Sequence, residues 1–190
     1  MSREKPEVEN NLGPATHSKM NLITALLRLL AFLATLSATL VMALNKQTKT
    51  VTVATIGTVP VNATLTANFQ HTPAFVFFVI ANANASLHNL LMLAVTFVGR
   101  PKYKFKGFAP LAIPLLDMAN VAIVSGGASA AGFMGQLGRD GNSHAKWNKI
   151  CDKFETFCDR SGGAIIASFA GLTLMIIICS ISIAKLRNHA

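Results

Sequence analysis

Two side chains of opposite charge lie inside long apolar runs of this sequence. Arg28 is the only charged residue in the run 20–44, and Asp117 is the only one in the run 108–137. A charge in the middle of a membrane-spanning helix costs roughly 2.5–3.5 kcal/mol, so each residue requires a partner. If both runs are spanning helices, Arg28 and Asp117 lie about 12–14 Å from the same membrane face. We therefore predict an intramembrane ion pair between them.

Polar side chains also occur within the apolar runs, and their positions predict a polar interior of the helix bundle. Lipid offers these groups no hydrogen-bond partners, so we expect them to bond across the bundle. Asn89 is expected to reach the layer of the ion pair, whereas its neighbour His88 is expected to point elsewhere. The predicted polar interior consists of Asn82, Ser86, His88, Asn89 and Asn120.

The sequence is compatible with three roles for the predicted ion pair. It is a packing clamp that fixes helix order, a part of a polar pathway for an ion or solute, or a contact between protomers. The clamp is the leading interpretation. No phosphate loop, HExxH motif, Cys-x-x-Cys motif or Ser-His-Asp set accompanies the pair, and the three cysteines fit no zinc spacing. We expect no catalytic residue, no metal site and no cofactor.

The elements that would position these residues are membrane helices. Hydrophobic residues make up 52% of the chain and charged residues only 13%, whereas a soluble domain carries about 25% charged residues. A spanning helix needs about 20 mostly apolar residues. Four runs qualify, at about 20–44, 73–98, 108–137 and 162–184. The predicted fold is an all-α four-helix transmembrane bundle formed by residues 20–187.

The basic residues predict the orientation of this bundle. The short loop 99–107 contains four of them and no acid, namely Arg100, Lys102, Lys104 and Lys106. Such loops favour the cytoplasm, which places the polar tail 1–19, expected to be disordered, and the C-terminal residues 188–190 there as well. The net charge of +9 sits in clusters beside apolar runs, which suits lipid headgroups rather than nucleic acid.

The first outer loop contains a strand pattern and a glycosylation sequence. Apolar and polar residues alternate from Thr58 to Gln70, and 51–55 provide a partner strand with Gly57 near the turn. We predict a short extracellular β-ribbon that rests on the outer face, since a two-stranded ribbon alone is marginal. Asn62, in Asn-Ala-Thr, is a candidate glycosylation site on its polar side.

The last outer loop contains two of the cysteines. An apolar stripe predicts a helical turn or two over 147–157, with Trp147 at the membrane interface. Cys151 and Cys158 would lie about 10 Å apart on a straight helix, which is too far for a bond. The disulfide that we expect between them therefore requires the helix to break.

Small residues predict close helix packing in the third run. Gly127, Ala131 and Gly135 recur every four residues, which lets helix backbones approach closely. Packing within the bundle and an oligomer face both remain open.

These features together resemble the Casparian strip membrane domain protein-like (CASP-like) family of land plants, which is related to the MARVEL four-helix proteins. The likeness rests on Arg28 and Asp117 in the first and third spans. It extends from about Asn21 to Arg187 through Pro73-Ala74-Phe75 with Ala81-Asn82, and through Trp147, Ile150-Cys151 and Phe157-Cys158. The first outer loop departs from members that build the strip, because it has no acid and one aromatic residue, Phe69.

The resemblance implies a multi-pass plasma-membrane protein with cytosolic ends that self-associates. We therefore expect a non-enzymatic scaffold that organises a membrane domain and local cell-wall modification. The expected partners are further copies, related four-span proteins in hetero-oligomers, membrane lipids and secreted cell-wall enzymes. The alternative function is a small channel or transporter that uses the polar bundle interior.

Overall fold

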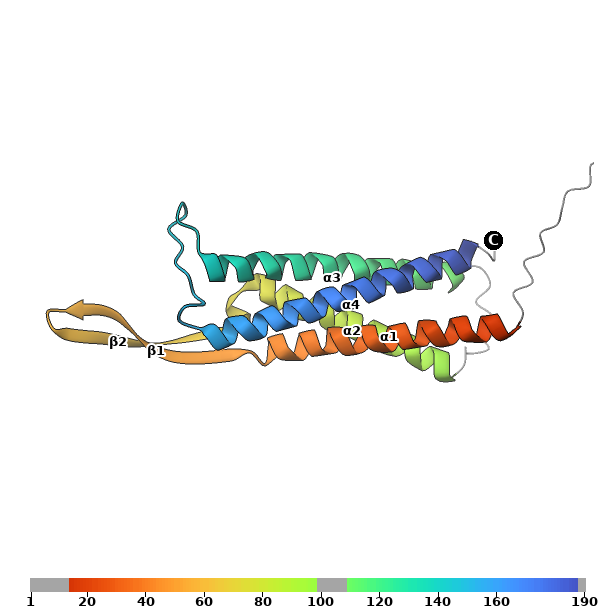
Figure 1. The fold of residues 1–190 in the computed structure, drawn as a ribbon, viewed down its shortest axis with the longest axis horizontal. Coiled ribbons are helices and arrows are strands. Elements are labelled where there is room, and N and C mark those ends of the chain that lie inside the picture. The colour runs from red at the N-terminus through yellow and green to blue at the C-terminus, as the bar shows by residue number, and fades with distance from the viewer. Residues whose placement is uncertain (1–13, 99–108, 188–190) are drawn as a thin grey trace, which may run out of the picture.

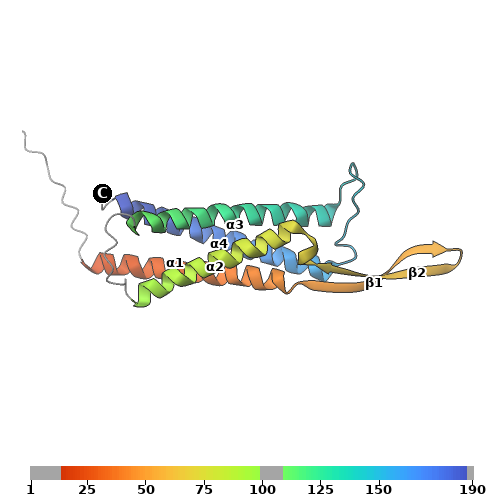
Figure 2. The same ribbon diagram turned by 180° about the vertical axis from the view of Figure 1, so that it is seen from behind.

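The computed structural model describes residues 14–98 and 109–187, which form four long helices and one β-ribbon (Figures 1 and 2). The helices are α1 (Pro14–Ala43), α2 (Pro73–Val98), α3 (Ala109–Asp140) and α4 (Glu155–Arg187). All four are long and apolar enough to cross a membrane. The predicted four-helix transmembrane bundle is confirmed.

The helices pack as a square. α1 packs against α2 and α4, and α3 packs against the same two helices. α1 and α3 therefore lie on one diagonal, and α2 and α4 lie on the other. Side chains that join diagonal partners must cross the centre of the bundle.

Two helices begin before the apolar runs that predicted them. α1 begins at Pro14, so the expected disordered tail is wrong for residues 14–19; a proline suits a first helical position because its missing N–H would have no partner there. α4 begins at Glu155 rather than near residue 162. Residues 1–13 of the predicted tail, the basic loop 99–107 and the C-terminal residues 188–190 lie outside the described part of the chain.

The predicted ribbon follows α1 directly. β1 (Lys46–Ile56) pairs antiparallel with β2 (Val59–Asn68), and a β-bulge lies between Thr52 and Ala54. Gly57 at the turn has a φ of +64°, which favours glycine. The short helix η1 (Phe69–His71) then leads into α2. The ribbon does not rest on the outer face as expected: it extends beyond the bundle along the long axis (Figure 1), since only its base packs on the bundle.

The loop between α3 and α4 contains no helix over Trp147–Lys153. The predicted helical stripe is therefore wrong there except for a single turn, in which the Phe154 N–H donates to the Ile150 carbonyl. Trp147 pairs with Asn142 in an isolated β-bridge, and the N–H groups of Ile150 and Cys151 donate to the Gly138 carbonyl. Cys151 and Cys158 form a disulfide with a Cα–Cα distance of 5.7 Å. The expected break in the helix is confirmed, because only Cys158 lies in α4.

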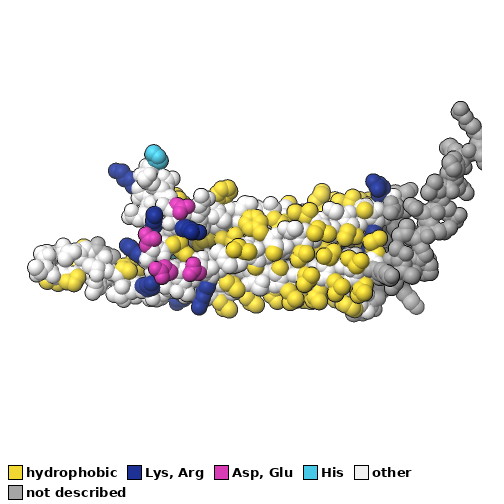
Figure 3. All heavy atoms as spheres, viewed as in Figure 1, with side chains coloured by type: hydrophobic (Ala, Val, Ile, Leu, Met, Phe, Trp, Pro, Cys, Tyr) yellow, Lys and Arg dark blue, Asp and Glu magenta, His cyan; other side chains and the backbone are white. Residues whose placement is uncertain are grey.

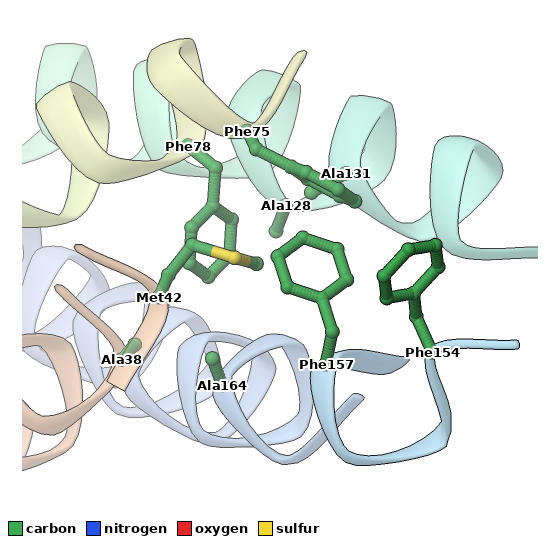
Figure 4. Close-up of a cluster of buried hydrophobic side chains, with 9 residues drawn as sticks. All are labelled: Ala38, Met42, Phe75, Phe78, Ala128, Ala131, Phe154, Phe157 and Ala164. Atoms are coloured by element: carbon green, nitrogen blue, oxygen red, sulfur yellow. The ribbon is translucent and has the colours of Figure 1, made fainter. Parts of the chain in front are cut away.

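Buried apolar side chains form two clusters along the bundle axis. The cluster at the ribbon end joins all four helices and the last loop (Figure 4): it consists of Ala38, Met42, Phe75, Phe78, Ala128, Ala131, Phe154, Phe157 and Ala164. The rings of Phe75 and Phe157 lie 6.1 Å apart at 59°. The second cluster lies deeper in the bundle and includes Ala31, Ala81 and Val124.

The surface agrees with a membrane setting. Hydrophobic side chains cover the length of the helices, whereas charged side chains gather where the ribbon meets the bundle (Figure 3). Exposed apolar residues include Leu26, Ile80, Leu115 and Ile166, and lipid rather than water accommodates such a surface.

Candidate functional site

Arg28 and Asp117 meet in the centre of the bundle. Arg28 Nη1 donates to Asp117 Oδ1 at 3.0 Å, and Nη2 donates to Oδ2 at 2.8 Å. The two side chains are 6% and 4% exposed. The pair crosses the α1–α3 diagonal, which suits the long, flat guanidinium group because it bonds a carboxylate through two parallel hydrogen bonds.

His88 and Ser182 complete the surroundings of the Asp117 carboxylate. His88 Nε2 lies 2.7 Å from Oδ1, and Ser182 Oγ lies 3.2 Å from Oδ2. A carboxylate that faces a guanidinium is ionised and only accepts hydrogen bonds, so Nε2 carries the donated proton. Each helix thus contributes one side chain to a four-membered polar cluster: Arg28 from α1, His88 from α2, Asp117 from α3 and Ser182 from α4.

His88 therefore replaces Asn89 in the expected arrangement. Asn89 is buried, but its Nδ2 donates to the Ala85 carbonyl of its own helix at 2.9 Å. The row that contains Asn84 and His88 faces α3, because Asn84 Nδ2 donates to Asn120 Oδ1 at 3.0 Å. The expectation that His88 points away from the ion pair is wrong, since the packing of α2 turns this row toward Asp117.

The other predicted polar residues are also bonded within the bundle. Asn82 Oδ1 accepts from Ser168 Oγ across the α2–α4 diagonal at 2.8 Å. Ser86 Oγ donates to the Ala83 carbonyl, and Asn120 Nδ2 donates to the Leu116 carbonyl. Sequence reasoning missed the roles of Ser168 and Ser182. Both are hydroxyl residues on a span without charged residues, and their spacing places them on the same inward face of the helix.

The small residues of α3 pack inside the bundle. A Cβ added to Gly127 would lie 3.0 Å from Ala81 Cβ of α2, and one added to Gly135 would lie 3.6 Å from Ile165 Cδ1 of α4. Ala131 is fully buried. This stripe is therefore a packing face for α2 and α4, and the structure does not place it on the outer surface as an oligomer face.

The sequence of the chain matches a known protein family. Residues 17–174 match the sequence profile of the Casparian strip membrane protein domain. The chain belongs to the CASP-like family. The matched range contains three members of the polar cluster, Arg28, His88 and Asp117, whereas Ser182 lies beyond it.

Named plant relatives match almost the whole chain. CASP-like protein 1B2 from Populus trichocarpa is 60% identical over 186 residues, which cover 97% of this chain and 92% of the relative. CASP-like protein 1B2 from Vitis vinifera is 56% identical and covers 98% and 92%. CASP-like protein 1B1 from Arabidopsis thaliana is 55% identical and covers 90% and 87%. No solved structure matches this chain.

In this CASP-like chain, polar contacts also attach the ribbon to α4. Gln47 Oε1 accepts from the Phe157 N–H at 2.8 Å, which satisfies one N–H of the first helical turn. The buried Asn45 donates through Nδ2 to the Phe157 carbonyl and to Ser161 Oγ. These contacts hold the base of the ribbon against α4. The signal in the sequence was a stretch of six polar residues, 45–50, after an apolar run.

Asn62 lies on the ribbon and outside the bundle. Its side chain is exposed, and its Oδ1 accepts from Thr52 Oγ1 at 2.8 Å. This bond does not use Nδ2, the atom to which a glycan would be attached. The structure therefore leaves the predicted acceptor accessible.

The polar cluster is suited to holding helices together. Its carboxylate has one guanidinium, one imidazole and one hydroxyl as donors, all from different helices. In the described part of the chain, no group of three or more His, Cys, Asp or Glu residues could bind a metal ion. The chemistry that the cluster offers is charge neutralisation and hydrogen bonding in a nonpolar surrounding.

Proposed function

We propose that this chain is a non-enzymatic plasma-membrane scaffold that self-associates and organises a membrane domain at the cell wall. The observation that carries the proposal is the contact of one carboxylate, Asp117, with side chains from all three other helices. Hydrogen bonds and an ion pair in lipid lack competition from water, so this cluster fixes the order and rotation of the helices. A scaffold depends on such a constant shape.

The positions of the apolar helix surfaces and of the two projecting segments support the same role. The helices present apolar side chains to lipid, while the ribbon and the disulfide-bonded loop extend from one end. With the termini in the cytoplasm, as the basic loop favours, these two segments face the wall. They would then be available to further copies, to related four-span proteins and to secreted wall enzymes. Membership of the CASP-like family adds weight to this assignment.

The transport alternative has less support from the bundle interior. The polar residues that motivate it are bonded to one another or to their own helices, as in Asn84 with Asn120 and Asn82 with Ser168. A solute path would have to break these bonds. Flux measurements on reconstituted liposomes separate the two functions: flux that disappears in Asp117→Asn would support transport.

Self-association is tested directly in native membranes. Two copies with different epitope tags are expressed together, extracted in polymer nanodiscs without detergent, and analysed by co-purification and mass measurement. We expect particles that contain both tags and a mass of more than one chain. Particles that hold a single chain at native abundance would refute the scaffold.

A further inference from the structure

The β-ribbon has two chemically different faces. On one face the cross-strand neighbours are polar: Thr48 Oγ1 lies 3.0 Å from Thr66 Oγ1, and Thr50 Oγ1 lies 3.2 Å from Thr64 Oγ1. We call this the threonine face. Directly opposed residues share a face, so the register assigns the apolar pairs to the other side. This apolar face contains Val51, Ala54, Val59, Val61, Ala63, Leu65 and Ala67.

The apolar face of the ribbon is covered at the base of the ribbon and is exposed toward the turn. Ala67 packs against the buried cluster at the ribbon end of the bundle. Farther along the strand, Leu65, Val61 and Val59 are 42%, 38% and 63% exposed. The face is thus a continuation of the core that loses its cover as the ribbon leaves the helices.

Lipid is not placed to cover the exposed part. The ribbon continues along the bundle axis (Figures 1 and 2), and ten paired residues extend it by roughly 33 Å. Such a length carries the turn away from the apolar belt of the helices (Figure 3). The partner of this face is therefore a protein surface on the same side of the membrane.

The scarcity of charged residues on the ribbon favours the ribbon of a second copy as that partner. No Asp, Glu, Lys or Arg occurs from Thr50 to Gln70. Strands usually carry charges that prevent association with like strands, and this ribbon lacks them over most of its length. Lys49 is the one charged residue on the apolar face, and it lies near the base. Its long side chain allows the ammonium group to reach water at the rim of a contact.

We propose that the apolar face of the ribbon binds the apolar face of the ribbon of a second copy. The inference deepens the proposed scaffold function and rests on it. Two copies in one membrane project their ribbons in the same direction, so the faces meet by rotation about an axis normal to the membrane. Pairing would bury Leu65, Val61 and Val59 of both copies and leave both threonine faces, with Asn62, in water.

The size of the contact explains why it would depend on the membrane. A face about 33 Å long and two strands wide offers roughly 300 Å² per copy. Stable dimers of soluble proteins bury about 800 Å² per partner. Ribbons alone would therefore remain monomeric in water, whereas chains held in one bilayer have a high effective concentration.

The test uses single cysteines at the same height on opposite faces. Leu65→Cys is on the apolar face, and Thr50→Cys, next to the partner residue Lys49, is on the threonine face. The native Cys151 and Cys158 are bonded and Cys179 is buried, so the unmodified chain is the background. Differently tagged copies are co-expressed, and the membranes are oxidised with copper phenanthroline. We expect a two-tag disulfide dimer with Leu65→Cys at roughly ten times the yield with Thr50→Cys, as for a 1.4 kcal/mol preference.

A charge variant and an energy-transfer measurement complete the test. Val59→Asp, introduced into a Leu65→Cys chain, should lower the dimer yield roughly tenfold by lost burial and like-charge repulsion. Energy transfer between labelled cytoplasmic tails reports association of the whole chains. Equal yields from both faces, or a product of Leu65→Cys with a different protein, would overturn the ribbon contact. Absent crosslinks with intact energy transfer would also overturn it and leave the scaffold standing, whereas absent energy transfer in the unmodified chain would remove both.

Discussion

Asp117 differs from its partners because three side chains depend on it. Without this carboxylate, Arg28 becomes a buried charge with no counter-charge, and His88 and Ser182 lose their acceptor. Without Arg28, Asp117 still accepts hydrogen bonds but is a buried anion with no counter-charge. Each loss is costly because lipid cannot solvate what remains.

A double-mutant cycle measures this dependence. Removing one partner of a buried ion pair typically costs about 3–5 kcal/mol of unfolding free energy, because the other charge stays behind. We expect Arg28→Leu and Asp117→Leu each to show a loss of this order, and the double variant to lose clearly less than the sum. Unfolding is followed by circular dichroism in mixed micelles titrated with dodecyl sulfate. The lipid-facing Thr173→Leu is the control, and strictly additive losses would contradict the pair.

The stability effect of replacing His88 is a second prediction about a single side chain. Interhelical hydrogen bonds in membranes contribute on the order of 0.6–1.7 kcal/mol, so His88→Leu should be milder than Arg28→Leu. Its cost should largely disappear in an Asp117→Leu background, since the two side chains are bonded. Asn89→Leu is the matched control, because Asn89 bonds only its own helix in the described contacts. Coupling of Asn89 rather than His88 to Asp117 would contradict the observed rotation of α2.

The contrast between His88 and Asn89 also shows which part of the polar cluster the sequence could predict and which part it could not. A lone charge in an apolar run must find a counter-charge, so Arg28 and Asp117 identify each other from composition and depth. Which of two adjacent residues faces Asp117 depends on the rotation of α2, and successive residues differ by about 100° around a helix. That rotation is set by packing, for example by Gly127 against Ala81, and no local pattern reveals it.

At the scale of elements, close backbone approach decides how α1 and α4 pack. A Cβ on Gly171 would lie 2.9 Å from Thr35 Cγ2 and 3.4 Å from Ala34 Cβ. Thr35 is buried, and its hydroxyl donates to the Ala31 carbonyl, so a branched, bonded side chain would have to move. The contact lies between the two buried polar layers formed by Ser168 and Ser182 on α4.

Gly171→Ala should therefore destabilise the bundle. Overpacking of this kind costs about 1–3 kcal/mol, measured with the same dodecyl sulfate titration. Gly163→Ala is the matched control on the same helix, because no atom lies within 4 Å of the added Cβ. The control should be neutral or stabilising by up to about 1 kcal/mol, since alanine favours helix more than glycine does. Equal effects at both positions would show that α1 and α4 do not approach closely there.

The elements at the ribbon end show a second limit of sequence reasoning. Trp147, Ile150, Phe154 and Phe157 have helical spacing, but only Phe157 lies in α4. The N–H groups of Ile150 and Cys151 bond the Gly138 carbonyl, so the helical pattern is limited to one turn after Ile150, and the disulfide joins Cys151 to α4. Periodicity describes a local preference, and these longer-range bonds override it. The ribbon was predictable because strand alternation and Gly57 act in the same local segment.

At the scale of the whole molecule, the four spans followed from composition, while the course of the ribbon did not. An apolar run of about 18 residues or more with few charges indicates a membrane-spanning helix. The direction of the ribbon depends on its base, where Asn45 and Gln47 bond the start of α4. Those contacts join residues more than 100 positions apart, which a local pattern cannot anticipate.

The orientation of the molecule in the membrane can be tested with its two glycosylation acceptor sequences. Asn62-Ala63-Thr64 lies on the exposed ribbon, whereas Asn84-Ala85-Ser86 lies inside α2 with Ser86 buried. If the ribbon faces outward, we expect a glycan at Asn62 alone, because transfer requires an accessible acceptor on that side. The gel mobility of the protein from plant membranes should increase on endoglycosidase treatment and in Asn62→Gln, and remain unchanged in Asn84→Gln. Acceptor triplets moved into both tails should stay unmodified; modified tails with an unmodified Asn62 would reverse the orientation and place the ribbon in the cytoplasm.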